Sequence, residues 1–470
     1  MTKSRTGIEG LDEVTRGGLP YGRPTLICGG SGCGKSALSM EILIQGALKF
    51  DEPGLFFSFE QSEHELIQDF SSLHAMLPDL VQQGKLYIEY IDGSPAGQSQ
   101  VGEFTLDALF VRIEAALSNV KGRRVVLDSI EALFATFPDK TFMRNELHRL
   151  FAWFKEREIT VVITAEAGEH SLTRWGLEEY ITDCVISIDH RIEEQISTRR
   201  LRIIKYRGSA HGTNEFPFII SEDGVSVIPI TSFGLDYSVS SEGVSTGIPD
   251  LDEMLLGKNG YYRGSSVLIS GQAGCGKSSV AAAFAASVCA SGESCLYFAF
   301  EESPQQMLRN MASVGIELQE WLDRGLLSIK AEAPTLTGLE YKLHMMIAMV
   351  NEIDPAAVVI DPITNLISIG SVREVKSMLV RFMDFLKGRH ITTLMTHLNS
   401  GAADLMETQV GVSSIMDTWV SLSRRSSGSS NARLLEIIKA RGMKHCEERR
   451  AFVLHDGGIS IQRDGEISHE

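Results

Sequence analysis

Short apolar runs alternate along the chain with longer stretches in which apolar residues recur every three or four positions. The short runs have the length of buried strands, and examples are residues 24–28, 55–60 and 125–129. The longer stretches have the period of amphipathic helices, as at residues 106–117, 143–154, 339–350 and 372–386. Alternating strands and helices predict an α/β fold with mainly parallel sheets flanked by helices.

The pattern of the first half occurs again in the second half at a nearly constant offset. Matching segments are 6–13 and 246–253, 55–60 and 296–301, 125–129 and 358–362, 160–164 and 392–396, and 205–211 and 439–445. So regular an offset indicates an internal duplication. The sequence therefore predicts two tandem domains, 1–230 and 240–470, joined around the polar, turn-forming stretch 221–244.

A glycine-rich loop lies between a strand and a helix in each half. Residues 29–36 and 271–278 both fit G-x-x-x-x-G-K-[ST], a loop whose backbone N–H groups surround the phosphates of a nucleotide. In this motif Lys35 and Lys277 would contact the β- and γ-phosphates, and the hydroxyls of Ser36 and Ser278 would bind Mg²⁺. Two matches in equivalent contexts predict two nucleotide-binding sites.

An aspartate ends a later strand in each half. Asp128 and Asp361 follow apolar runs, and the carboxyl end of a central strand is where ligands bind in such sheets. Beside a phosphate-binding loop, each aspartate is expected to hold Mg²⁺ directly or through water. The alternative is an aspartate that only caps the next turn.

Carboxylates also follow the second strand of each half, as Glu60 and as the pair Glu301 and Glu302. A carboxylate there can orient or deprotonate an attacking water or hydroxyl, although a solvated strand end is the alternative. Gln61 stands where the second half has its second glutamate. Because glutamine cannot accept the proton of water, Glu60 is the base expected in the first half.

A K-x-R-G segment ends a strand in each half. Alternation places its lysine and arginine on one face of the strand, where both can meet one anion. Each loop already has its own lysine, so a second cation pair is what an assembly needs to contact a neighbour's γ-phosphate, as arginine fingers do. The alternative is an ordinary solvated strand end. The cations are Lys205, Arg207, Lys439 and Arg441, and the weaker candidates His211 and His445 follow them.

Composition narrows the class of protein. The net charge of −17 over 470 residues argues against a generic affinity for nucleic acid. No apolar run approaches the roughly 20 residues that span a bilayer, and residues 1–5 lead into no signal-peptide core. Seven scattered cysteines without a C-x-x-C pair indicate reduced thiols and a cytoplasmic protein, with neither a disulfide framework nor a zinc site.

Together these landmarks resemble the KaiC family of RecA-like double-domain ATPases. The resemblance extends from Thr6 to about Leu454 and includes RWGLEE at 174–179, LRN at 308–310 and both K-x-R-G-x-x-H segments. It implies two tandem RecA-like P-loop NTPase domains, stacked into a two-tiered homo-hexamer with ATP and Mg²⁺ at the subunit boundaries. It also implies slow ATP hydrolysis in the first ring, and autokinase and autophosphatase activity in the second.

The resemblance assigns nucleotide-binding residues in both halves. In the first they are Gly32, Cys33, Gly34, Lys35, Ser36, Ala37, Lys205, Tyr206, Arg207 and His211. In the second they are Gly274, Cys275, Gly276, Lys277, Ser278, Ser279, Arg433, Lys439, Ala440, Arg441 and His445.

The segment VSSIMDT at 412–418 is similar to the phosphorylated segment of this family. By position Ser413 and Ser414 would be the phosphate acceptors, and Glu301 would draw the hydroxyl proton, with acceptor and ATP on different subunits. Without the resemblance, two serines near a strand start would be taken for plain loop residues.

Two departures from the family and two rival classes stay open. Gln61 implies altered hydrolysis in the first ring, and the short chain after Arg441 argues against regulation by KaiA, whereas a KaiB-like partner stays open. A RecA/RadA-like recombinase or DnaB-like helicase would share the ATPase core, but the acidic balance and the lack of a DNA-binding module disfavour it. A scaffold that uses ATP only to hold a ring is disfavoured by Glu60 and Glu301.

Overall fold

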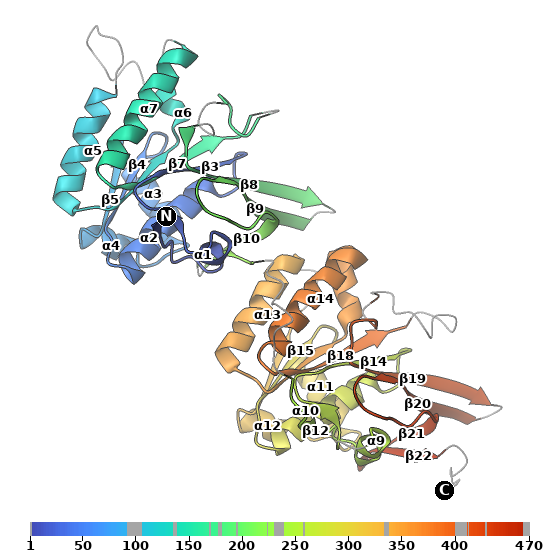
Figure 1. Cartoon of the computed structure of the whole chain (residues 1–470). Coiled ribbons are helices and arrows are strands. Elements are labelled where there is room, and N and C mark those ends of the chain that lie inside the picture. The colour runs from blue at the N-terminus through green and yellow to red at the C-terminus, as the bar shows by residue number, and fades with distance from the viewer. Residues whose placement is uncertain are drawn as a thin grey trace. The chain divides into compact units, whose positions relative to one another are not determined.

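The computed structural model describes residues 2–91, 106–134, 139–168, 171–176, 181–193, 196–222, 224–229, 239–256, 259–332, 338–399, 411, 413–427 and 430–463. The chain divides into two units, Met1–Ile230 and Thr231–Glu470, and each is considered by itself. Both units consist of a central sheet with helices on its two faces (Figure 1). Within the described ranges, no helix is both long and apolar enough to cross a membrane.

The first unit contains a nine-stranded sheet in the order β11-β10-β9-β8-β3-β7-β6-β4-β5. Neighbouring strands from β8 to β5 are parallel, and β9, β10 and β11 extend one edge as antiparallel strands. In chain order the elements are β1 (Lys3–Ser4), α1 (Leu11–Val14), β2 (Leu19–Pro20), β3 (Pro24–Gly29), α2 (Lys35–Lys49), β4 (Gly54–Ser58), α3 (Glu63–Ser71), α4 (Leu77–Gln82), β5 (Leu86–Tyr90), α5 (Asp107–Val120), β6 (Arg124–Asp128), α6 (Glu131–Phe134), α7 (Lys140–Glu156), β7 (Thr160–Glu166), β8 (Cys184–Glu193), β9 (Ile196–Tyr206), β10 (Glu215–Ser221) and β11 (Gly224–Val227).

The second unit repeats this architecture, with the sheet order β16-β15-β17-β18-β14-β19-β20-β21-β22. Its strands from β16 to β19 are parallel and β20, β21 and β22 are antiparallel. The elements are β12 (Gly243–Val244), α9 (Pro249–Met254), β13 (Tyr261–Tyr262), β14 (Ser266–Gly271), α10 (Lys277–Ala290), β15 (Cys295–Ala299), α11 (Pro304–Ala312), α12 (Gln319–Asp323), β16 (Leu327–Ala331), α13 (Leu339–Ile353), β17 (Ala357–Asp361), a 3₁₀ helix (Ile363–Ile369), α14 (Val372–Lys387), β18 (Thr392–Leu398), β19 (Thr418–Ser427), β20 (Ser430–Ala440), β21 (Arg450–His455) and β22 (Gly458–Arg463).

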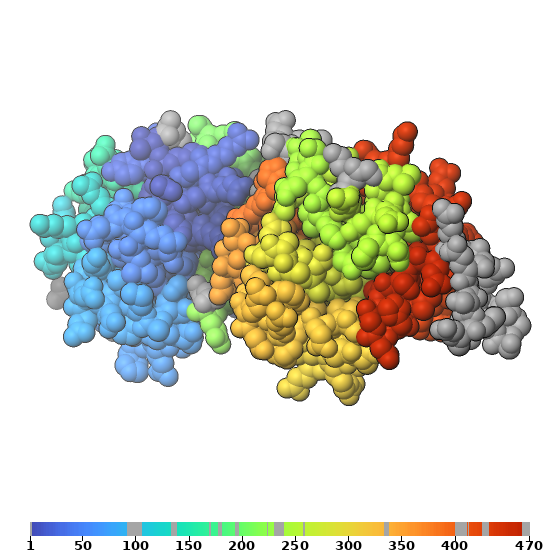
Figure 2. Space-filling view, turned by 90° about the horizontal axis from the view of Figure 1, so that it is seen from below, coloured from blue at the N-terminus to red at the C-terminus, as the bar shows by residue number. Residues whose placement is uncertain are grey.

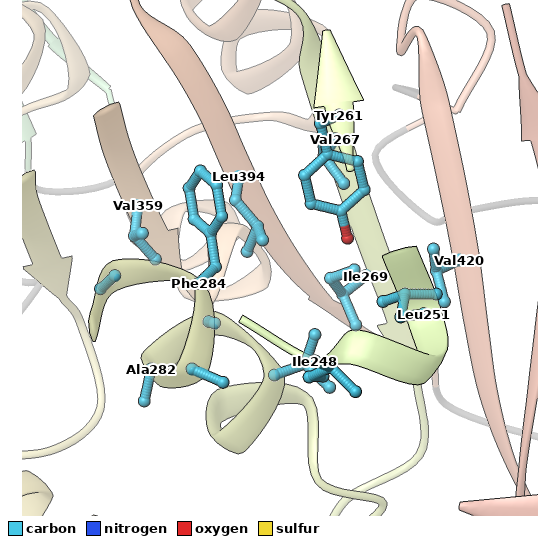
Figure 3. Packing of buried hydrophobic residues seen from close by; sticks show 14 of the residues in the cluster. Ile248, Leu251, Tyr261, Val267, Ile269, Ala282, Phe284, Val359, Leu394 and Val420 are labelled. Atoms are coloured by element: carbon cyan, nitrogen blue, oxygen red, sulfur yellow. The ribbon is translucent and has the colours of Figure 1, made fainter. Parts of the chain in front are cut away.

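Each sheet is buried on both faces because its strands are apolar at consecutive positions. In the first unit Phe56 packs with α2, α3 and α4, whereas its neighbour Phe57 packs with α5 and α7 on the opposite face. In the second unit Phe284 of α10 lies against Val359 and Leu394 of the strands (Figure 3). In Figure 2 the N-terminal segments of the first unit (blue) and of the second (yellow-green to yellow) form much of the visible surface.

Serine residues cap the helices that follow β4 and β15. Ser62 and Ser303 form capping boxes with Glu65 and Gln306 at the starts of α3 and α11. These caps fix the chain directly after the strand-ending carboxylates at Glu60 and Glu301, and so help to hold both in place.

The chain divides after Ile230, within the predicted join at 221–244, but the first residues of that segment belong to the first unit. Ser221 and Gly224 are paired in a hairpin that joins β10 to β11, so residues as far as Val227 belong to the first sheet. Gly224 has a φ of +98°, a turn conformation that glycine adopts easily. The polar composition at the start of the segment therefore marks a hairpin turn within the first unit.

Candidate functional site

The two G-x-x-x-x-G-K-S loops connect β3 to α2 and β14 to α10. Gly32 and Gly34 have φ values of +72° and +108°, and Gly274 and Gly276 have +71° and +99°, which favour glycine. A Cβ atom at Gly32 would meet nothing within 4 Å, so one side of the loop is open. An open loop at the N-terminus of a long helix fits the phosphates of a nucleotide.

The loop lysines are buried and differ between the units. Lys35 Nζ donates to the carbonyls of Gly29 and Gly30, both at 3.0 Å, and to Glu166 Oε1 at 2.7 Å. Lys277 Nζ donates to the Gln272 carbonyl at 2.8 Å, and Leu398 stands at the strand end equivalent to Glu166. Burial lowers the pKa of Lys277, which the carboxylates of Asp361 and Glu301 counteract. Phosphate oxygens would replace the acceptors that both lysines now have.

We expect Glu166→Leu to tighten nucleotide binding by the first unit about fivefold, because a partly exposed ion pair of about 1 kcal/mol no longer competes with phosphate for Lys35. Calorimetric titration with a non-hydrolysable ATP analogue measures the change. The reciprocal control, Leu398→Glu, should weaken the second site. Weaker binding by Glu166→Leu would show that Glu166 assists the nucleotide.

The strand-ending aspartates lie beside these loops. Asp128 is buried and hydrogen-bonded by Thr164 and by Ser36 of the loop. Burial raises the pKa of Asp128, and these two hydroxyl contacts oppose the rise. Asp361 accepts hydrogen bonds from Thr396 and, at 2.7 Å, from the Tyr297 hydroxyl. Hydroxyl and carboxylate oxygens are the ligands that Mg²⁺ prefers, so these residues fit that ion.

The glutamates lie next to the aspartates because main-chain hydrogen bonds connect the strand ends. Phe59 and Phe300 donate their N–H groups to the carbonyls of Asp128 and Asp361, both at 2.8 Å. Glu60 and Glu301 follow directly and are exposed. Glu60 Oε1 accepts a hydrogen bond of 2.7 Å from the buried Ser129, which orients its carboxylate.

The first unit has Gln61 where the second has Glu302. Eight residues later the exchange runs the other way, because the first unit has the acid Asp69 and the second has the amide Asn310. Gln61 donates to Asp69 at 3.2 Å, whereas Glu302 accepts from Asn310 at 3.1 Å. Each unit therefore keeps one carboxylate and one amide in contact, with their order in the chain reversed. Asp69 is a candidate that the sequence analysis missed, and its signal was the paired exchange at equivalent positions.

In each unit the phosphate-binding loop and the K-x-R-G segment lie at opposite ends of the parallel strands. We call these two ends the carboxyl edge and the amino edge of the sheet. The Arg441 N–H donates to the Asp417 carbonyl at 2.8 Å, and the Asp417 N–H donates to the Ser266 carbonyl at 2.9 Å. Ser266 begins β14, whereas the loop follows its last residue, Gly271. Five residue steps along a strand span about 16 Å, which is longer than an arginine side chain.

The first unit has the same arrangement, through Arg207, Asp183 and Pro24 at the start of β3. In each unit, therefore, the loop lies at the carboxyl edge of the parallel strands and the K-x-R-G segment at their amino edge.

In each unit one aspartate forms ion pairs both with the arginine of the K-x-R-G segment and with a lysine. Lys155 Nζ lies 2.8 Å from Asp183 Oδ2, and Arg207 lies 3.7 Å from Asp183 Oδ1. Lys387 and Arg441 lie 2.6 and 3.9 Å from Asp417 in the second unit. The guanidinium side chains stay about half exposed, so they can contact another molecule. The sequence analysis missed this lysine and aspartate. Their recurrence at equivalent positions of both halves is the signal that could have found them.

Asp417→Asn should destabilise the second unit by about 2 kcal/mol at pH 7, because Asp417 accepts charge-assisted hydrogen bonds. Burial raises the pKa of Asp417, but the hydrogen bonds from Lys387 and Ser266 outweigh it and hold the pKa below its ordinary value. A lowered pKa gives stability that is complete above the unfolded pKa of about 3.9 and is lost in more acidic solution.

The difference between wild type and Asp417→Asn in urea unfolding should therefore shrink as the pH falls below about 4. A difference that widens in acid would contradict the assignment.

The second K-x-R-G segment also contacts the predicted acceptor serines. Lys439 Nζ donates to the Ser413 carbonyl at 2.8 Å, and Arg441 Nη2 donates to the Ser414 carbonyl at 2.7 Å. Burial lowers the pKa of Lys439, with a smaller effect from Arg441. Ser413 is half-buried and Ser414 is exposed, in a turn before β19. Cations and candidate acceptors thus lie together at the amino edge.

Two further predicted nucleotide-binding residues, Arg433 and Tyr206, lie at opposite ends of the strands of their units. Arg433 lies at the loop of its own unit, 3.4 Å from the Gly274 carbonyl, and Arg424 of β19 donates to the same atom at 2.8 Å. Tyr206 is buried with its hydroxyl on the Gly18 carbonyl, so only its main chain is available.

The other predicted residues lie in and around the loops and the K-x-R-G segments. Cys33, Cys275 and Ser279 are buried, whereas Ala37 and Ser278 are half-buried at the loop ends. Ala440 is buried, and His211 and His445 are half-buried. Val412, Leu177, Glu178 and Glu179, which carried part of the resemblance, lie outside the described residues.

The two nine-stranded sheets, each with a G-x-x-x-x-G-K-S loop after a central strand, define tandem RecA-like P-loop NTPase domains. The chain matches the family model described as "ATPase: KaiC" over residues 4–232 and 244–466.

Relatives among the clock proteins match nearly the whole chain. It is 46% identical to the circadian clock protein KaiC2 of Synechocystis sp., over 98% of this chain and 81% of the relative. It is 34% identical to the circadian clock oscillator protein KaiC of Synechococcus elongatus, over 98% and 89%, and to KaiC 1 of Synechocystis sp., over 97% and 88%. The chain therefore belongs to the KaiC family of ATPases.

Proposed function

We propose that this chain hydrolyses ATP in its first unit and, in its second, transfers the γ-phosphoryl group of ATP to Ser413 or Ser414 and later removes it. We further propose that the chains form a homo-hexamer in which each K-x-R-G segment completes the nucleotide site of the next subunit. The relatives named as circadian clock proteins support a use as a timer or signalling device.

The observation that carries the proposal is the separation of the two edges. Arg441 and Lys439 lie a strand length away from their own loop but contact the carbonyls of Ser414 and Ser413. A site made from one chain would therefore lack both the second cation pair and the acceptor. If the loop of one chain faced the K-x-R-G segment of its neighbour, the shared site would contain the loop, the second cation pair and the acceptor serine. Transfer of a phosphoryl group between subunits requires these three parts together.

The proposed roles follow from the chemistry of each side chain. Lys35 and Lys277 would neutralise phosphate oxygens, while Ser36 with Asp128, and Ser278 with Asp361, would hold Mg²⁺. Bound Mg²⁺ supplies charge neutralisation at the transferred group. Glu60 would orient and deprotonate water, and Glu301 would accept the hydroxyl proton of a serine, assisted by Glu302.

The direct test is mass spectrometry of the chain after incubation with ATP and Mg²⁺. We expect phosphate on Ser413 or Ser414, and its absence from a Ser413→Ala, Ser414→Ala double variant. Unphosphorylated serines in a chain that still hydrolyses ATP would reduce the function to that of an ATPase. Strong stimulation of turnover by single-stranded DNA would instead favour a recombinase-like enzyme.

A further inference from the structure

The carboxylate of Asp361 is held on both oxygens by hydroxyl groups. Thr396 of β18 donates to Oδ1, and the Tyr297 hydroxyl of β15 donates to Oδ2 at 2.7 Å. Tyr297 is completely buried, so it does not contact a ligand itself. Its hydroxyl lies among mainly apolar side chains and points at the carboxylate that ends the neighbouring strand.

The first unit has no such hydroxyl at the equivalent place. Phe56 pairs with Val126, two residues before Asp128, in the same register in which Tyr297 pairs with Val359, two residues before Asp361. The threonine contact is present in both units, from Thr164 and Thr396. The tyrosine hydroxyl is therefore a difference between two otherwise matched sites.

Packing alone does not require this hydroxyl. Phe56 fills the equivalent position in the first unit and is completely buried there. A buried hydroxyl also needs a partner to offset its lost contacts with water. The single oxygen that Tyr297 adds is used on Asp361, which points to a role at that carboxylate.

We propose that Tyr297 is a positioning residue of the second site, which fixes the Asp361 carboxylate so that its remaining lone pairs face Mg²⁺ or a water bound to it. The inference rests on the proposed role of Asp361 as a magnesium ligand. A carboxylate has about four acceptor positions, and two hydroxyl bonds leave two of them for the ion while preventing rotation. Groups that orient a ligand in this way change metal affinity by about 10- to 100-fold when removed.

The experiment measures metal binding and not turnover. Mn²⁺, which shares the oxygen preference of Mg²⁺, is titrated into the full-length chain with a non-hydrolysable ATP analogue, and free Mn²⁺ is followed by electron paramagnetic resonance. Wild type should bind two ions per chain. For Tyr297→Phe we expect one of the two sites to weaken about tenfold and the other to stay unchanged.

Tyr261→Phe is the matched control. Tyr261 is completely buried in the same cluster, and its hydroxyl has no hydrogen-bond partner within the described part of the chain. Figure 3 shows its ring among Val267, Ile269 and Leu251. Removing this hydroxyl changes the core without touching Asp361, so both Mn²⁺ sites should keep their affinity.

The Mn²⁺ titrations distinguish a failure of the positioning role of Tyr297 from a failure of the proposed magnesium site at Asp361. Unchanged Mn²⁺ binding by Tyr297→Phe, or equal weakening by Tyr261→Phe, would overturn the positioning role if Asp361→Asn still removes one site. If Asp361→Asn itself leaves both Mn²⁺ sites intact, the magnesium assignment fails.

Discussion

Lys277→Ala should abolish phosphate incorporation at Ser413 and Ser414, with a loss of at least about 100-fold, whereas Lys35→Ala should mainly reduce ATP hydrolysis and assembly. Lys277 is buried at the start of α10 and its Nζ lies on a loop carbonyl. Alanine removes the only cation that the loop itself brings to the phosphates. The separate effects follow because each lysine belongs to a different unit with its own sheet.

Incubation with γ-labelled ATP measures the first effect, and release of inorganic phosphate measures the second. Nucleotide-induced assembly of both variants, followed by light scattering, controls for loss of the ring. Equal losses of labelling and hydrolysis in the two variants would refute the division of labour between the units.

Arg441→Ala should lower phosphoryl transfer by about a thousandfold, the usual contribution of an arginine supplied to a neighbour's site. Mixing Arg441→Ala with Lys277→Ala chains should then restore part of the activity. In a randomly mixed ring with equal amounts of each, about one quarter of the boundaries join an intact loop to an intact arginine. The chains are dissociated without nucleotide, mixed and reassembled with ATP before labelling.

Arg433→Ala provides the control for the mixing experiment. Arg433 lies at the loop of its own unit, so a mixture of Arg433→Ala and Lys277→Ala chains contains no boundary with an intact loop side. This mixture should stay as inactive as its components. Failure of the Arg441→Ala mixture to recover, despite subunit exchange, would place Arg441 at a site within its own chain.

The described structure confirms the sequence predictions that depended on local pattern. The helix predicted at 372–386 lies within α14, the one predicted at 106–117 lies within α5 except for its first residue, and the loops at 29–36 and 271–278 follow buried strands. The division after Ile230 falls within the predicted join at 221–244, which starts too early because Ser221 and Gly224 pair across a hairpin turn, and composition does not distinguish a turn from a linker.

The contacts that orient the site were much harder to predict. Glu166 meets Lys35 across 131 positions, and Ser129 meets Glu60 across 69. Neither pairing has a local sequence signature, because the order of strands in the sheet decides which strand ends are neighbours. The Gln61 exchange looked like a simple loss of a carboxylate until the structure showed Asp69 beside it.

The sequence by itself determined the duplicated α/β architecture, the two G-x-x-x-x-G-K-S loops and the choice of candidate cations and carboxylates, because these depend on periodicity and on residue types at short spacings. Only the tertiary structure decided that loop and K-x-R-G segment occupy opposite edges of one sheet, and that Tyr297 and Thr396 hold Asp361. The physical reason is that strand order and direction are properties of the whole sheet, set by long-range pairing that no single segment encodes.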